Sequence, residues 1–140
     1  DSFKKGEKFE NYLSNYNHGT LILNIKESGI EKEAIKIVKK FNIKNFFLID
    51  VELPFIFQNN KSVNKDISIR YSEYESIETV KKFVNNVGWV WIDTHKKLPL
   101  NKNISNTLKK FKSCLVCPER WGRPKDIRPY FQKMQKINFI

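Results

Sequence analysis

The stretch Asn45-Phe46-Phe47-Leu48-Ile49-Asp50 decides the fold class, because it is an apolar run of strand length that ends in a carboxylate. Helical patterns flank this stretch on both sides. Residues 30–41 repeat apolar side chains at helical spacing, and residues 53–59 form a short helix opened by Pro54. Where a helix connects one strand to the next, as such alternation predicts, the connection is a crossover and the strands are therefore parallel.

The same alternation extends along the whole chain. Further strands are expected at residues 20–26, 66–71, 88–93 and 113–118, and further helices at residues 7–16, 76–84, 103–111 and 124–136. Residues 137–140 could begin one more strand. The strand starts lie 21 to 25 residues apart. Such regular repetition favours a parallel (β/α) barrel of TIM type over a doubly wound sheet.

The length limits how much of a barrel this chain can form. A complete eight-stranded barrel takes about 250 residues, whereas the 140 residues here hold five to six strand–helix units. We therefore expect residues 1–140 to form a single, partial α/β barrel domain, with two or three units missing at the N-terminus.

The composition is that of a folded and basic chain. Hydrophobic residues make up 40%, and 26 Lys and Arg against 15 Asp and Glu give a net charge of +11. The lysines are scattered beside predicted helices, which favours a solvated surface over a nucleic-acid patch. Nucleic acid is therefore not the expected partner. With no apolar leader and no run of about 20 apolar residues, the chain is expected to be cytoplasmic and without a membrane span.

Polar side chains end each predicted strand. Alternation along residues 20–26 turns Leu21 and Leu23 towards the helices, and Asn24 and Lys26 towards the barrel interior. The residues that end successive strands are Lys26, Asp50, Arg70, Asp93 and Glu119. Strand ends also meet water, so each charge alone has an ordinary explanation. Because five occur in succession and their mixed signs allow pairing, we expect a site at the carboxyl ends of the strands.

The cysteines and histidines carry weaker signals. Cys114 and Cys117 have C-x-x-C spacing, but within a strand that spacing places the two sulfurs on opposite faces. Because no second pair completes a zinc site, we expect buried structural thiols. His18 is expected in a turn. His95 follows Asp93 at a strand end, where it could act as an acid or a base.

Two loops after strands allow two interpretations each. Glu73 could take part in chemistry or could support the start of the next helix, whose N-cap would be Ser72 or Ser76. Glu75 is expected in this capping role. Residues 118–124 combine an acid, two arginines and an indole before a helix start. Arg123 and the free helix amides there suit phosphate or another anion. The alternative is a tight loop with an aromatic lid.

Two strand segments, Leu23-Asn24-Ile25-Lys26 and Phe47-Leu48-Ile49-Asp50, resemble the central part of the glycerophosphodiester phosphodiesterase-like barrels. This superfamily also includes the phosphatidylinositol-specific phospholipases. Segments 69–76, 89–93 and 115–119 are similar to those of short bacterial relatives. The resemblance covers nearly the whole chain and implies a phosphodiester hydrolase of lipid metabolism.

In active members of that superfamily, two histidines act as acid and base, and carboxylates hold a divalent cation such as Mg or Ca. The His-Arg, the Glu-x-Asp pair and the His-Asp come from the first two barrel strands. Those segments are not present here, and Asp1 would correspond to the last of them. The family's Glu-x-Lys reads Asn24-Ile25-Lys26 in this chain. Asn24 thus replaces the metal-binding Glu and offers a cation only a carbonyl oxygen.

These observations lead to three hypotheses. The first is a phosphodiesterase-like hydrolase or a degenerate enzyme, in which Lys26 and Arg70 hold the phosphate of a small phosphorylated substrate. Its supporting or further ligand-binding groups would be Asp50, Glu73, Asp93, Glu119 and Arg123. The second is a non-catalytic barrel that binds an anion or a sugar phosphate. The third is a basic nucleic-acid-binding protein.

Overall fold

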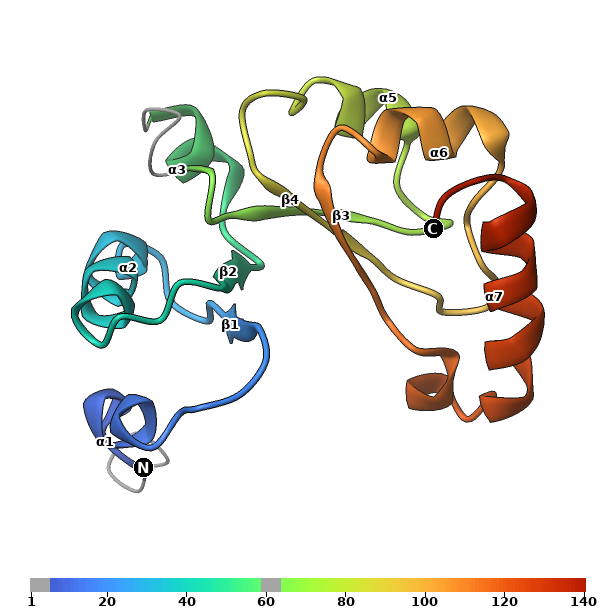
Figure 1. Ribbon diagram of the computed structural model, residues 1–140. Coiled ribbons are helices and arrows are strands. Elements are labelled where there is room, and N and C mark those ends of the chain that lie inside the picture. Colours follow the sequence, from blue (N-terminus) through green and yellow to red (C-terminus); the bar gives the residue numbers. More distant parts are fainter. Residues whose placement is uncertain (1–5, 59–63) are drawn as a thin grey trace.

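The computed structural model describes residues 6–58 and 64–140 (Figure 1). The strands are β1 (Leu21–Asn24), β2 (Phe46–Ile49), β3 (Ser68–Tyr71), β4 (Trp89–Ile92) and β5 (Lys112–Leu115). The α-helices are α1 (Phe9–Ser14), α2 (Glu31–Lys40), α3 (Leu53–Gln58), α5 (Ile77–Lys81), α6 (Lys102–Leu108) and α7 (Ile127–Lys136). The 3-10 helices η2 (Pro118–Trp121) and η3 (Pro124–Asp126) precede α7. The predicted alternation of strands and helices is confirmed, while Asp1 and Asn59 lie outside the described residues.

The prediction of a TIM-type barrel is wrong. The described residues form a mixed α/β arrangement with two small parallel sheets, one of β1 and β2 and one of β3, β4 and β5. Paired strands run parallel, with Leu21 opposite Phe46 in the first sheet and Ser68 opposite Trp89 in the second. Regular strand–helix spacing indicates parallel strands, but closure into a barrel also requires enough strands with the right stagger.

The two sheets meet between β2 and β3. Leu48 forms a parallel bridge with Ile67, and its N–H donates to the Asp66 carbonyl at 2.8 Å. The Ser68 hydroxyl in turn donates to the Leu48 carbonyl at 3.1 Å. Leu48 and Ile67 are both fully buried. This junction places the carboxyl ends of β2 and β3 beside each other.

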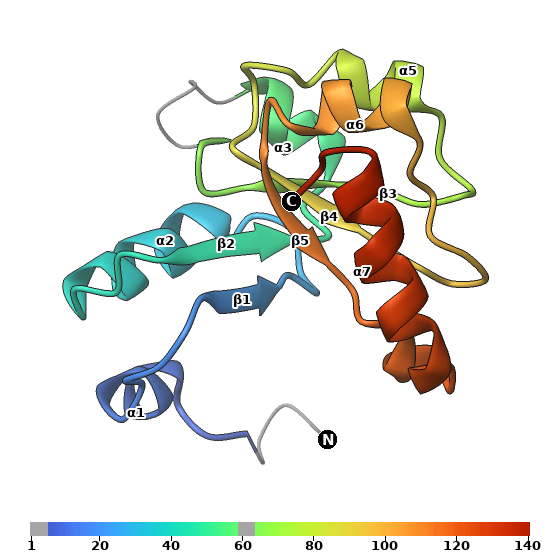
Figure 2. The same cartoon turned by 45° about the vertical axis from the view of Figure 1, so that its right-hand side comes forward.

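Burial of apolar faces holds the helices and sheets together. Helix α2 buries Ile35 and Val38 while its lysines stay exposed, as expected for an amphipathic surface helix. Phe47 of β2 is fully buried and stacks on Trp89 of β4, with ring centroids 4.4 Å apart. Helices α5 and α6 lie side by side in both views (Figures 1 and 2). Each contributes a fully buried side chain to the core, Val80 and Leu108 respectively.

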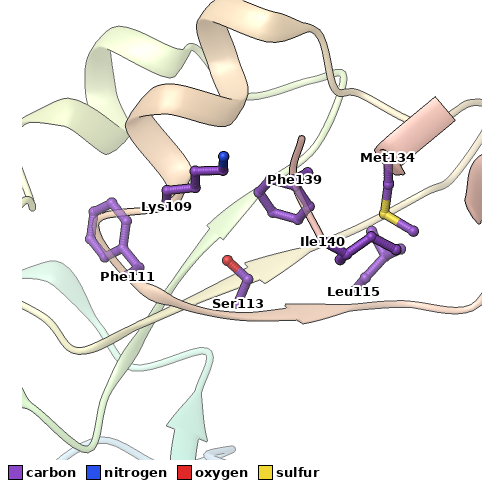
Figure 3. A pocket seen from close by; sticks show the side chains of 7 residues that line it. All are labelled: Lys109, Phe111, Ser113, Leu115, Met134, Phe139 and Ile140. Atoms are coloured by element: carbon purple, nitrogen blue, oxygen red, sulfur yellow. The ribbon is translucent and has the colours of Figure 1, made fainter. Parts of the chain in front are cut away.

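The last residues of the chain do not extend a sheet. Asn138 has a φ of 52°, and the Phe139 N–H donates to the Met134 carbonyl, which ends α7. Residues 137–140 are therefore not a strand, contrary to the expectation. Figure 3 shows Phe139 and Ile140 beside β5, where they help to line a cavity of about 410 Å³.

Gly88 lies where two segments of backbone approach closely. A Cβ atom at this position would lie 2.0 Å from the Lys65 carbonyl oxygen. The Gly88 N–H also donates to the Asn64 carbonyl at 3.2 Å, just before β4 begins. A side chain at position 88 would therefore push the start of β4 away from the segment that leads into β3.

Candidate functional site at the carboxyl ends of the strands

Four of the residues expected at strand ends lie together. Arg70 donates from Nη2 to Asp50 Oδ1 at 2.6 Å and from Nη1 to Asp93 Oδ2 at 2.5 Å. Lys26 Nζ lies 3.8 Å from Asp50 Oδ2. We call Lys26, Asp50, Arg70 and Asp93 the charged cluster. Its charges alternate in sign, so each carboxylate lies against at least one cation.

The backbone conformation of Asp50 brings its side chain to Arg70 in the charged cluster. Because Leu48 pairs with Ile67, continued strand alternation would place Asp50 on the face opposite Arg70. Asp50 instead adopts a φ of 59°, in the left-handed region that Asp tolerates better than most residues. Position at a strand end thus identifies the right residues, whereas strand alternation places Asp50 on the wrong face because it does not include the turn at this residue.

Asp93 is the most deeply buried member of the charged cluster. Its side chain is 3% exposed, and Oδ2 also accepts a hydrogen bond from Trp91 Nε1 at 3.1 Å. Asp93 Oδ1 is buried and has no hydrogen-bond partner among the described residues. Burial lowers the pKa of Arg70, but the hydrogen bond to Asp50 and the charges of Asp50 and Asp93 outweigh it and raise that pKa. A charged Arg70 is what a buried carboxylate requires.

An aromatic rim borders the charged cluster beyond Asp93. His95 Nε2 lies 3.6 Å from Asp93 Oδ2, as expected for a histidine after this strand. The His95 ring lies 4.4 Å from the Trp121 ring and 5.7 Å from the Tyr74 ring, measured between centroids. An aromatic lid in residues 118–124 was one of the two interpretations of that loop, whereas Tyr74 was not among the expected site residues. Strand alternation places Trp91 on the same face as Asp93, but it does not show the hydrogen bond between them.

The Arg123 guanidinium forms hydrogen bonds to other groups of the protein. Its Nη2 donates to the carbonyls of Thr94 and His95, and its Nη1 donates to Asp126 and to the Tyr130 hydroxyl. The hydrogen bond with Tyr130 is the main cause of a raised Arg123 pKa. Arg123 thereby fixes the backbone that carries His95. Glu119, the other candidate of this loop, is exposed on η2.

Two glutamates in the loop after β3, Glu73 and Glu75, accept hydrogen bonds from other residues of the protein. The Lys96 N–H donates to Glu73 Oε1 at 2.6 Å, and the Ser72 hydroxyl donates to Glu75. The expected helix cap is confirmed at Ser76, whose hydroxyl accepts from the Glu78 N–H at 3.2 Å. Burial raises the pKa of Glu73, but the backbone hydrogen bonds outweigh it and the net shift is downward.

A small cavity of about 80 Å³ adjoins Lys26 and Asp50. The other acidic side chains that line it are Glu27, Glu31 and Glu52. Glu31 is 1% exposed, and its Oε2 accepts from the Gly29 N–H at 2.8 Å, while Oε1 has no hydrogen-bond partner among the described residues. Carboxylates therefore outnumber cations on this side of the cluster, and an occupant would need hydrogen-bond donors.

Possible metal ligands are sparse in this region. Within residues 6–58 and 64–140, no group of three His, Cys, Asp or Glu is arranged to hold a metal ion. Asn24, the weak candidate ligand, is exposed at the end of β1. Cys114 and Cys117 are free, and Cys114 is half-buried, which raises its pKa. Cys117 is exposed, so the expectation of two buried thiols is wrong for this residue.

Two other features bear on partners. The cavity beside Phe139 is lined mainly by apolar side chains, among them those of β5 and α7 (Figure 3), and no residue of the charged cluster lines it. None of the helices in the described part of the chain is long and apolar enough to cross a membrane.

Comparisons of the chain with protein-family models, with curated proteins and with solved structures found no match.

Proposed function

We propose that this protein binds a small phosphorylated polyol at the charged cluster. The observation that carries the proposal is the position of Arg70, which is held between Asp50 and Asp93 at the carboxyl ends of parallel strands. Ligands of open α/β sheets commonly bind outside these strand ends. Arg70 is 36% exposed, so its fixed guanidinium is still accessible to a ligand.

The mixture of charges favours a ligand that carries both acceptors and donors. Lys26 is 76% exposed and has only a long contact with Asp50, so its ammonium group is available to phosphate oxygens. The neighbouring carboxylates would repel a bare anion but accept hydrogen bonds from hydroxyl groups. A polyol phosphate supplies both groups, and the resemblance to glycerophosphodiester phosphodiesterases points to the same class of compound.

Binding is favoured over hydrolysis by the positions of the two histidines. Hydrolysis in the family that the chain resembles uses a pair of histidines with a divalent cation. Here His95 follows β4, whereas His18 precedes β1 and its ring lies 4.7 Å from Tyr16. Because the paired strands are parallel, these positions belong to opposite ends of the strands. A phosphodiester hydrolase is therefore the second candidate, and it requires acid–base groups beyond these two.

Thermal unfolding tests the proposal. A ligand at 100 times its Kd stabilises a protein by about 2.7 kcal/mol, so glycerol phosphate should raise the Tm measurably. Lys26→Ala should remove most of this shift. Lys36→Ala is the matched control, because Lys36 is 79% exposed and also lies 3.8 Å from a carboxylate, that of Glu33.

Two results would count against binding at the charged cluster. One is a Tm that does not respond to glycerol phosphate. The other is an equal loss of the shift in Lys36→Ala, which would indicate general charge screening. Release of phosphomonoester from a phosphodiester in the presence of Mg or Ca would instead favour the hydrolase.

A further inference from the structure

Lysines gather at the amino ends of the strands, opposite the charged cluster. We define the basic edge as the nine lysines found at position 65 and within residues 39–44, 81–82 and 109–112. Each lies near the end of a helix, in the connection that follows a helix, or at the start of a strand. A helix that joins two parallel strands runs back against them, so helix ends and strand starts share one edge. All nine side chains are exposed.

Few carboxylates accompany these lysines. Lys39 Nζ lies 3.1 Å from Asp66 Oδ2, and Lys81 Nζ lies 2.7 Å from Glu78 Oε1. The charged cluster, in contrast, contains as many acids as bases. The basic edge therefore holds much of the excess positive charge of a chain whose net charge is +11.

The helix macrodipole explains only part of this pattern. Lysines in a last helical turn, such as Lys39 and Lys40, are stabilised by the partial negative charge of the helix end. Lys44, Lys65 and Lys112 have no such reason, because they precede β2, precede β3 and begin β5. The helix macrodipole therefore does not explain a cation at these three strand starts.

Lys44, Lys65 and Lys112 lie before or at the starts of β2, β3 and β5, and we call them the row; β4, which lies between β3 and β5, contributes no lysine to it. Neighbouring strands lie about 4.8 Å apart, so the row extends over roughly 14 Å. Lys112 Nζ lies 5.3 Å from the centroid of the Trp89 ring, and the Lys112 side chain is exposed. A row of cations matches a linear polyanion with regularly repeated phosphates better than it matches a single small anion.

An exposed aromatic side chain accompanies the row. Phe57 near the end of α3 is 65% exposed, and its ring packs against Phe83 with centroids 5.4 Å apart. Phe83 directly follows Lys82 of the basic edge. Proteins that bind single strands combine a basic track with aromatic rings on which bases stack. We propose that the basic edge binds the sugar–phosphate backbone of a single-stranded nucleic acid, with Phe57 as a stacking position.

The test measures the salt dependence of binding. A fluorescein-labelled single-stranded oligonucleotide is titrated with the protein, and anisotropy is followed between 50 and 300 mM NaCl, conditions over which phosphate contacts weaken strongly. The triple variant Lys44→Gln, Lys65→Gln and Lys112→Gln should bind at least tenfold more weakly. Because each phosphate contact contributes about 0.7 to the salt slope on a single strand, that slope should fall by about 2.

A second triple variant serves as the control. Lys36→Gln, Lys102→Gln and Lys125→Gln remove the same charge from exposed positions outside the basic edge, and should change the affinity less than threefold. Phe57→Ala should weaken binding without changing the salt slope. Circular dichroism checks that each variant is folded.

Three outcomes would overturn the proposal. They are equal losses in the two triple variants, no binding of the oligonucleotide by the unaltered protein at 50 mM NaCl, and tighter binding to duplex than to single strands. Binding to phosphatidylserine vesicles without binding to the oligonucleotide would assign the basic edge to an anionic membrane surface instead. None of these results depends on whether glycerol phosphate binds at the charged cluster.

Discussion

Arg70 Nη1 lies 2.5 Å from Asp93 Oδ2, although the two residues are 23 positions apart in the sequence. Arg70 lies in β3, and Asp93 directly follows Ile92, the residue of the adjacent parallel strand β4 that lies opposite Tyr71. Arg70 is thereby the cation that compensates a nearly buried carboxylate. The stability of the protein and the shape of the candidate site depend on the same contact.

Replacing Arg70 tests how far the stability of the protein depends on the contact with Asp93. In Arg70→Met the Asp93 carboxylate stays buried without its cation, so the free energy of unfolding should fall by about 2 kcal/mol. This loss is smaller than that expected for a fully buried ion pair, because the Arg70 side chain is partly exposed to solvent. Urea unfolding measures the change. Adding Asp93→Asn to this variant should recover part of the loss, because the uncompensated charge is then gone. A loss below about 0.5 kcal/mol in Arg70→Met would show that solvent already compensates Asp93.

The local structure followed from the sequence because it depends on neighbours in the chain. Apolar runs such as residues 46–49 and the amphipathic pattern of α2 predicted strands and helices that the structure contains. Barrel closure did not follow, because it depends on strand number and stagger. The single bridge between Leu48 and Ile67 joins two small sheets where a continuous ladder was expected.

The candidate site was predictable in part for a similar reason. Strand ends at regular spacing identified Asp50, Arg70 and Asp93, and parallel strands necessarily bring such ends together. The sequence pattern does not specify the left-handed turn at Asp50. It also does not show that Arg123 points inwards to carbonyl groups, because a guanidinium suits an anion and a buried carbonyl equally well.

Asp50 offers a test of that turn. Asp50→Asn keeps a side chain that tolerates positive φ and removes the charge, so it should cost less than 1 kcal/mol of stability. Asp50→Ala adds the strain of a left-handed conformation of about 1 to 2 kcal/mol. The comparison of the two variants by urea unfolding isolates the backbone contribution. Equal losses would mean that the φ of 59° carries no strain relevant to folding.

Gly88 provides a test of the packing between the strand starts. Gly88→Ala should lower the free energy of unfolding by about 3 kcal/mol, because the new methyl group overlaps the Lys65 carbonyl and forces the backbone apart. Gly6→Ala is a suitable control, since nothing lies within 4 Å of a Cβ atom at that position. Thermal unfolding of the two variants gives the comparison. If both keep the Tm of the unaltered protein, the close approach at Gly88 does not constrain the fold.

Glu73 links the stability of the site loops to pH. The backbone N–H of Lys96 donates to its carboxylate, and the pKa of Glu73 lies below its ordinary value of 4.5. A lowered pKa in the folded state means that the carboxylate stabilises the protein fully above pH 4.5 and loses this effect as pH falls through the folded-state pKa. The stability difference between the unaltered protein and Glu73→Gln should therefore be largest near neutral pH, at about pH 6 to 7, and should narrow at pH values below 4.5. Urea unfolding at several pH values measures this difference. A difference that widens as pH falls would mean that burial, which raises the pKa, outweighs the hydrogen bonds in the loop.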